Sequence, residues 1–181
     1  QPLGMKDTAF WVPAEKRERF AQAYTHPGAL RPYRQTHLEV GDYDREPVFA
    51  SGGAGLVSTL DDYAAFATML LEGGRYPGGQ LLQPETVRFL TSPQLGPQPL
   101  ADVWNSLDGF SYGKLMRVMR DPGRYPGLSR MDEYGWDGWL GTYFCISPED
   151  DLVLLLMLQK TDTGTIDVTR KFRSAAFAAL D

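Results

Sequence analysis

Residues 134–158 read YGWDGWLGTYFCISPEDDLVLLLML, and this stretch decides the fold class. The glycine- and aromatic-rich part, Tyr134–Ile146, predicts a strand region. The next five residues, SPEDD at 147–151, predict a turn, and the apolar run Leu152–Leu158 predicts a further strand. A short turn between two strands favours an antiparallel hairpin. An unbroken apolar run indicates a strand that helices cover on both faces.

Other elements surround this hairpin. A two-residue alternation from Phe110 to Met119 predicts one more strand before it. The predicted helices are Ser58–Glu72, Glu85–Thr91 and Asp167–Leu180. Because helices come first, then three strands, then a helix, we expect an α+β fold with an antiparallel sheet flanked by helices.

The helix at 58–72 has the clearest signals. Ser58 or Thr59 suits its N-cap, with an acidic residue three positions on. Apolar side chains recur at helical spacing between Tyr63 and Leu71. Gly73 and Gly74 suit its end, because glycine adopts the left-handed conformation without steric cost.

Composition excludes several classes of function. The chain has 181 residues, of which 43% are hydrophobic and 23% charged, as in a globular domain or a part of one. Its net charge of −5 lacks the basic surface that binds nucleic acid. The apolar run at 152–158 is far shorter than the ~18 residues of a membrane helix, so we expect no membrane span. With Cys145 as the single cysteine, we expect no internal disulfide and no multi-cysteine metal site. No HExxH or similar metal motif occurs either, and we expect no metal and no cofactor.

The first residue bears on how much of a protein this is. Gln1 is not a start methionine, and no signal peptide follows it. A removed leader or upstream sequence would look the same, so the sequence leaves the compartment open. We treat the chain as a candidate second half of something longer.

Two short motifs and the two histidines have simpler interpretations than a functional site. Residues 51–55, SGGAG, lack the Gly-Lys-Ser/Thr ending of a phosphate loop and favour a flexible turn. Residues 109–113 match G-x-S-x-G, but the two histidines, His26 and His37, lie upstream and no helix follows Ser111. Surface positions, not metal ligation, are predicted for both histidines.

Ser111 and Lys114 match the S-x-x-K pattern of a serine–lysine dyad. Three-residue spacing brings two side chains together on a helix. On a strand, residues three apart point to opposite faces. The predicted strand therefore argues against this dyad.

Residues 134–143 leave two interpretations open. Their three glycines allow a ligand or a neighbouring chain to approach the backbone closely. Their two tryptophans and two tyrosines offer a large, rigid contact surface. The alternative is a bulged edge strand that packs its aromatic side chains inward.

Four segments share patterns with one known family. They are 2–8 (PLGMKDT), 51–71 (SGGAGLVSTLDDYAAFATMLL), 73–87 and 135–159. They resemble, in the same order, the segments PLGMxxT, SGGxGLxSTxxDYxxFxxMLL, GG…LLxPxTV and GWxGxxGTxFxxxPxxxLxxxxMxQ of the serine β-lactamase superfamily. The resemblance is to the branch of class C β-lactamases, D-Ala-D-Ala carboxypeptidases and family VIII esterases, which makes this chain similar to their C-terminal portion.

The resemblance implies both an architecture and a reaction. Residues 1–105 would form part of a helical lobe with connecting loops, and 106–181 the strands and last helix of an α/β lobe. The reaction would be acyl transfer from a small-molecule ester, amide or β-lactam. A serine attacks the carbonyl, a lysine and a tyrosine move protons, and two backbone N–H groups hold the oxyanion.

Trp136-Asp137-Gly138 occupies the place of the family's third motif, Lys/His-Thr/Ser-Gly, which makes these three residues candidates for substrate binding. The same resemblance makes the backbone N–H of Trp139 a candidate oxyanion donor. Asp137 departs from the pattern, because an ionised carboxylate donates no hydrogen bond and repels anions. We therefore expect neutral or cationic substrates.

The family's Ser-x-x-Lys and Tyr-x-Asn motifs lie upstream of its PLGM segment. Asn105 is the only asparagine here and Val103 stands two before it, so Tyr-x-Asn is absent from this sequence. We expect the chain to be inactive alone, to need a missing N-terminal half as partner, and to self-associate through an exposed sheet edge. Two alternatives remain: a non-catalytic module whose strand 134–143 holds a peptide or muropeptide, and a self-contained hydrolase that uses Ser111.

Overall fold

A five-stranded antiparallel sheet with the strand order β3-β4-β5-β6-β7 forms the centre of the protein. Its strands are β3 (Phe110–Tyr112), β4 (Arg117–Met119), β5 (Tyr134–Asp137), β6 (Tyr143–Ser147) and β7 (Leu152–Leu156). The computed structural model describes residues 2–21, 43–53, 55–95, 107–160 and 167–180. The predicted α+β class with an antiparallel sheet is confirmed.

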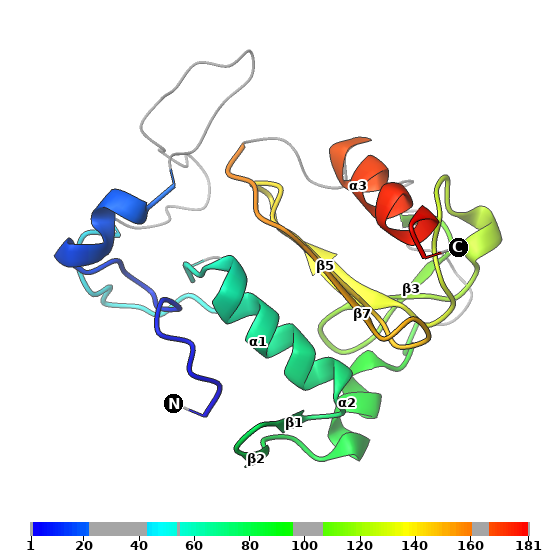
Figure 1. The fold of residues 1–181 in the computed structure, drawn as a ribbon, viewed down its shortest axis with the longest axis horizontal. Coiled ribbons are helices and arrows are strands. Elements are labelled where there is room, and N and C mark those ends of the chain that lie inside the picture. Colours follow the sequence, from blue (N-terminus) through cyan, green and yellow to red (C-terminus); the bar gives the residue numbers. More distant parts are fainter. Residues whose placement is uncertain (1, 22–42, 54, 96–106, 161–166, 181) are drawn as a thin grey trace.

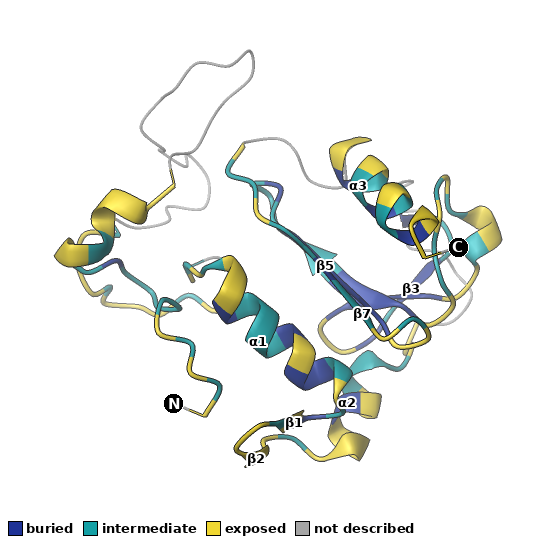
Figure 2. Cartoon of the chain, viewed as in Figure 1, coloured by how far each residue is buried: buried dark blue, intermediate teal, exposed yellow. Residues whose placement is uncertain are grey.

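Helices flank this sheet on both sides. The other elements in the described part of the chain are η1 (Ala14–Arg19), α1 (Leu60–Leu71), β1 (Arg75–Tyr76), β2 (Gly79–Gln80), α2 (Pro84–Thr91), η4 (Pro122–Arg124) and α3 (Asp167–Ala178). Figure 1 shows α1 and α3 on opposite sides of the sheet, and Figure 2 shows η1 as an exposed turn away from it. The three predicted helices are all present, with ends within two residues of those expected.

Local signals explain where α1 begins and ends. The Thr59 side chain accepts a hydrogen bond from the Asp62 backbone N–H at 3.3 Å, which caps the helix. Gly73 and Gly74 have φ angles of 63° and 92°, the left-handed conformation that ends a helix. The Asp62 carboxylate also accepts hydrogen bonds from the backbone of Lys6 and Asp7, so it attaches the N-terminal segment to α1.

The apolar strand β7 contacts a different helix on each face. Val153 and Leu155 pack against the core that α1 forms with the sheet. Leu152, Leu154 and Leu156 pack in the second core, with Phe177 of α3. Successive side chains of a strand point to opposite faces, so a continuous apolar run suits this sandwiched position. The prediction that helices cover both faces is confirmed.

In the described residues the sheet has five strands where the sequence predicted three. The single strand expected at 110–119 is a hairpin, β3–β4, in which Tyr112 pairs with Arg117. A hydrogen bond from Gly113 N to Met116 O, 2.7 Å long, closes the bend between the two strands. Both arms of a hairpin alternate with the same period of two, which is why the pattern concealed the turn.

The strand region predicted at 134–146 is likewise two strands, β5 and β6, in a second hairpin. β5 pairs with β4 on one side and β6 on the other, so interpreting 134–143 as an edge strand is wrong. The third hairpin, β6–β7, has the predicted antiparallel pairing, from Ser147 opposite Leu152 to Tyr143 opposite Leu156.

The expected division of the chain at residue 105 stays a prediction. Residues 96–106 lie outside the described residues, so the structure does not describe the boundary itself. On the N-terminal side of the boundary, α1 packs directly against the sheet. Ala67, Met69 and Leu70 of α1 share one buried cluster with Val118 and Ile146.

Candidate active site

The candidate residues Trp136, Asp137, Gly138 and Trp139 run from the end of β5 into the loop that leads to β6. Trp136 and Asp137 pair with Phe144 and Tyr143 of β6. Beyond them, Gly138 N donates to Thr142 O at 2.7 Å, and Gly141 N donates to Gly138 O at 2.9 Å. The second bond makes 138–141 a β-turn with Trp139 and Leu140 as its central residues.

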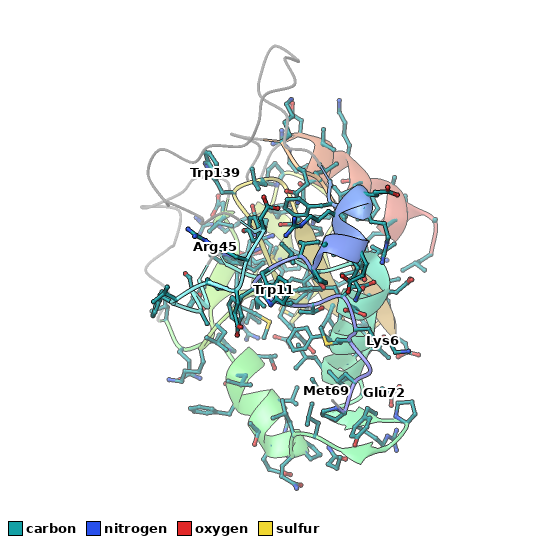
Figure 3. The ribbon with its side chains drawn as sticks, turned by 90° about the vertical axis from the view of Figure 1, so that its left-hand side faces the viewer. Lys6, Trp11, Arg45, Met69, Glu72 and Trp139 are labelled. Carbon is teal, nitrogen blue, oxygen red and sulfur yellow. The ribbon has the colours of Figure 1, made fainter. Side chains whose placement is uncertain are left out.

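A further hydrogen bond attaches this turn to the segment after β7, because Lys160 N donates to Leu140 O at 2.9 Å. Trp139 is half-buried. Figure 3 shows it at the periphery of the molecule, apart from Met69 and Glu72 at the end of α1. The candidate oxyanion N–H therefore belongs to a residue at the tip of a hydrogen-bonded hairpin.

Gly135 has to be a glycine because of the backbone of β6. A Cβ atom at this position would lie 2.1 Å from the carbonyl oxygen of Phe144 and 2.9 Å from the Cα of Cys145. Both atoms are backbone, so neither rotates away. The sequence suggested that a ligand or a neighbouring chain approaches the backbone of this stretch closely. At Gly135 it is the neighbouring strand β6 that does so.

Asp137 has a partner that sequence reasoning missed. Arg117, at the start of β4, donates a hydrogen bond from Nη1 to the Asp137 carboxylate, and the two side chains are only 4% and 10% exposed. The pair carries no net charge. Because Arg117 offsets this charge, Asp137 repels an anionic substrate less than a lone carboxylate would. The preference for neutral or cationic substrates stays a prediction.

Aromatic rings surround the Arg117 guanidinium. Its central carbon lies 5.3 Å from the ring centroid of Phe110 and 5.6 Å from those of Trp136 and Tyr143. Trp136 also contacts Tyr112 edge to face, with 5.4 Å between the ring centroids. A cation over aromatic faces is favourable, most of all away from water. Trp136 therefore contributes to the packing around the ion pair.

Ser111 and Lys114 do not form a dyad in the described structure. The Ser111 hydroxyl, buried on β3, donates to the Leu95 carbonyl at 3.2 Å. The Lys114 ammonium lies 5.0 Å from the centroid of the Phe89 ring. The sequence predicted that the two side chains would lie on opposite faces of one strand. Instead, Ser111 lies on β3 and Lys114 lies in the bend after it, and each contacts different residues.

Other groups that could act as nucleophiles or ligands lie elsewhere. Cys145 is fully enclosed in β6, and burial raises the pKa of its thiol to about 12, which keeps it protonated and unreactive. His26 and His37 fall outside the described residues. Within the residues that are described, no group of three or more metal-ligating side chains occurs.

The same described ranges contain no helix that is long and apolar enough to cross a membrane.

The chain is similar to known proteins over nearly all of its length. The family model described as Beta-lactamase matches residues 1–179. Protein Rv1367c of Mycobacterium tuberculosis (strain H37Rv) is 31% identical over 176 residues, which are 92% of this chain and 42% of that protein. A putative D-alanyl-D-alanine carboxypeptidase of Escherichia coli (strain K12) is 26% identical, over 92% of this chain and 39% of that protein.

Among solved structures, EstCE1, a hydrolase with promiscuous acyltransferase activity, matches with a TM-score of 0.77 and 18% identity. The match covers 99% of this chain and 48% of EstCE1. The chain thus spans about half the length of EstCE1 and less than half the length of each of the two relatives.

Proposed function

Because the chain belongs to the β-lactamase family, whose model matches residues 1–179, we propose that it is the C-terminal part of a serine hydrolase. Its reaction is acyl transfer from a small-molecule ester or amide. The observation that carries the proposal is the position of residues 136–139. The segment that resembles the family's third motif runs from the end of an inner strand into a hydrogen-bonded turn.

Each part of this segment receives a role in the proposed reaction. As a serine attacks the carbonyl carbon, negative charge develops on the carbonyl oxygen. The N–H of Trp139 is one of two donors that stabilise this charge. The backbone of Trp136, Asp137 and Gly138 forms the adjoining side of the substrate site, since the Asp137 side chain is paired with Arg117. A segment outside this sequence supplies the serine, the lysine and the tyrosine. This sequence contains one Ser-x-x-Lys pair, Ser111–Lys114, and those two side chains contact different residues.

The proposal is tested by comparing this chain with the natural gene product, whose intact mass is measured first. Hydrolysis of a p-nitrophenyl ester, a chromogenic cephalosporin and a D-Ala-D-Ala peptide is followed for both. We expect a gene product heavier than this chain, with turnover of at least one substrate. This chain alone should give none, because losing a nucleophile and its base costs about 10⁶-fold in rate.

Ser111→Ala is the matched control, made in both proteins. It should leave the activity of the longer protein unchanged, since the Ser111 hydroxyl is buried against Leu95. Turnover by this chain alone that disappears in Ser111→Ala would overturn the proposal and support the self-contained hydrolase.

Within the described residues, most of the aromatic surface that the binding-module alternative requires is not available; Trp139 alone is half-buried at the tip of the hairpin. Two of the four large aromatic residues in 134–143, Tyr134 and Tyr143, are buried in the two cores. Trp136 is partly buried against the first core. The large exposed aromatic surface that a peptide would need is therefore not formed by this stretch.

We also propose that the chain associates with itself through β7. In the described part of the chain β7 pairs with β6 on one side only, and a strand edge of this kind readily pairs with another chain. Light scattering after size exclusion over a dilution series should show a mass that rises with concentration. The longer gene product should remain monomeric. A monomer of this chain at every concentration would contradict the proposal.

A further inference from the structure

The ion pair between Arg117 and Asp137 stands where the backbone pairing of two strands stops. β4 and β5 are paired at Val118–Tyr134 and at Arg117–Gly135, and the pairing ends there. Among the described residues, Trp136 and Asp137, the next two residues of β5, pair with β6 alone. On the β4 side, the Arg117 side chain reaches across to Asp137, so an ion pair joins the two strands beyond their last backbone pair.

The guanidinium itself has little freedom to move. Arg117 is buried, and the rings of Phe110, Trp136 and Tyr143 surround it at 5.3–5.6 Å. Asp137 is nearly as enclosed, so its carboxylate has little access to water as an alternative partner. A buried charge that loses its partner is strongly disfavoured. Without Arg117, the Asp137 side chain would have to move toward solvent and take the end of β5 with it.

We propose that Arg117 is a positioning residue that acts through Asp137 on the turn 138–141. Asp137 directly precedes the turn, and Trp139 is the second residue after Asp137. Fixing Asp137 on its β4 side fixes the direction in which the Trp139 N–H points. That this order supports catalysis rests on the proposed function. That Arg117 orders the turn is independent of it.

The first test measures amide hydrogen exchange in this chain and needs no activity. Arg117→Met should raise the exchange of residues 136–142 by about tenfold or more, since the strand end then opens locally. Exchange in β7, at 152–156, should stay at the wild-type rate. The double variant Arg117→Met/Asp137→Asn should recover part of the protection, because it leaves no unpaired charge.

Two further variants keep this test decisive. Arg120→Met is the matched control, because Arg120 lies just after β4 and pairs with Asp132, but the two side chains are 47% and 60% exposed. It should leave the turn as protected as in the wild type. If Arg117→Met does not fold, Arg117→Lys retains the charge without the planar guanidinium and should give a smaller rise in the same residues.

The second test uses the longer protein of the preceding section. Arg117→Met should lower kcat for the ester by about 100-fold with KM within about twofold, because an error of ~1 Å in placing a reacting group has that effect. Arg120→Met should change neither constant. Equal exchange of the turn in Arg117→Met and Arg120→Met, or a uniform rise across the whole sheet, would overturn the positioning role. An inactive wild-type longer protein would overturn the proposed function and leave the exchange result standing.

Discussion

Replacing Arg173 with methionine is expected to lower the free energy of unfolding by about 3–5 kcal/mol, because it removes the partner of a buried carboxylate. Arg173 of α3 is 2% exposed and pairs with Glu133, which is 0% exposed. The guanidinium also donates to the Tyr143 hydroxyl at 2.5 Å and the Ser129 hydroxyl at 3.2 Å. One side chain thus joins α3 to the sheet and to the loop before β5.

Methionine fills similar space but leaves Glu133 with only neutral partners. Ser129 and the backbone N–H of Arg130 donate to its carboxylate at 2.9 and 3.3 Å, and neither carries a positive charge there. Single domains are stable by only about 5–15 kcal/mol, so this loss is a large fraction of the total. Replacing Glu133 by leucine in the same protein should restore much of it, because a buried apolar pair carries no desolvation cost.

Urea unfolding followed by tryptophan fluorescence measures this change. Arg170→Met is the control, on the same helix, because its pair with Asp167 is 41% and 69% exposed and should contribute less than about 1 kcal/mol. An unfolding midpoint for Arg173→Met equal to that of Arg170→Met would show that the buried network does not stabilise the fold.

The elements that the sequence predicted are those with signals inside a single segment. The cap at Thr59, the apolar side chains that follow it and the glycines at 73 and 74 all lie within α1 or next to it. The turn at 147–151 joins two strands that are neighbours in both sequence and space. Local chemistry decides such elements, so one sequence is enough to find them.

The turns at 113–116 and 138–142 were missed for a physical reason. Side chains alternate on both arms of a hairpin, and the short bends at Gly113 and Gly138 interrupt that alternation too little to be seen. The glycines in both stretches were the available signal, because glycine inside a strand pattern often marks a bend.

The two buried ion pairs, Arg117–Asp137 and Arg173–Glu133, could not be predicted from the sequence, because each joins two segments whose packing no local pattern indicates. The partners of Arg117 and Arg173 lie 20 and 40 residues away in the sequence. Arg117 meets Asp137 only because β4 and β5 pair in one register, and Arg173 meets Glu133 only because α3 packs on that face. The candidate site itself, 136–139, came from a family resemblance; its position in the hairpin is now known, and its roles remain proposals.

Replacing Gly135 with alanine is expected to destabilise the fold by about 3 kcal/mol, because the strands that position the candidate site lie too close for a methyl group. The added Cβ would lie 2.1 Å from the Phe144 carbonyl oxygen, which belongs to the backbone of the paired strand. Relief requires β5 and β6 to separate. That separation would strain the pairing of Trp136 with Phe144 and of Asp137 with Tyr143, on which the turn depends.

Comparison with two other glycines isolates the backbone clash from the general effect of adding a methyl group. At Gly138 the Cβ would lie 2.4 Å from Thr142 Oγ1, a side-chain atom that is able to rotate, so Gly138→Ala should cost less. At Gly52 no atom lies within 4 Å, so Gly52→Ala should stay within about 0.5 kcal/mol of the wild type. Urea unfolding of the three variants should therefore rank Gly135 lowest in stability, then Gly138, then Gly52. A Gly135→Ala protein as stable as Gly52→Ala would mean that β5 and β6 adjust to the methyl group without loss, and that the close approach does not hold the site in place.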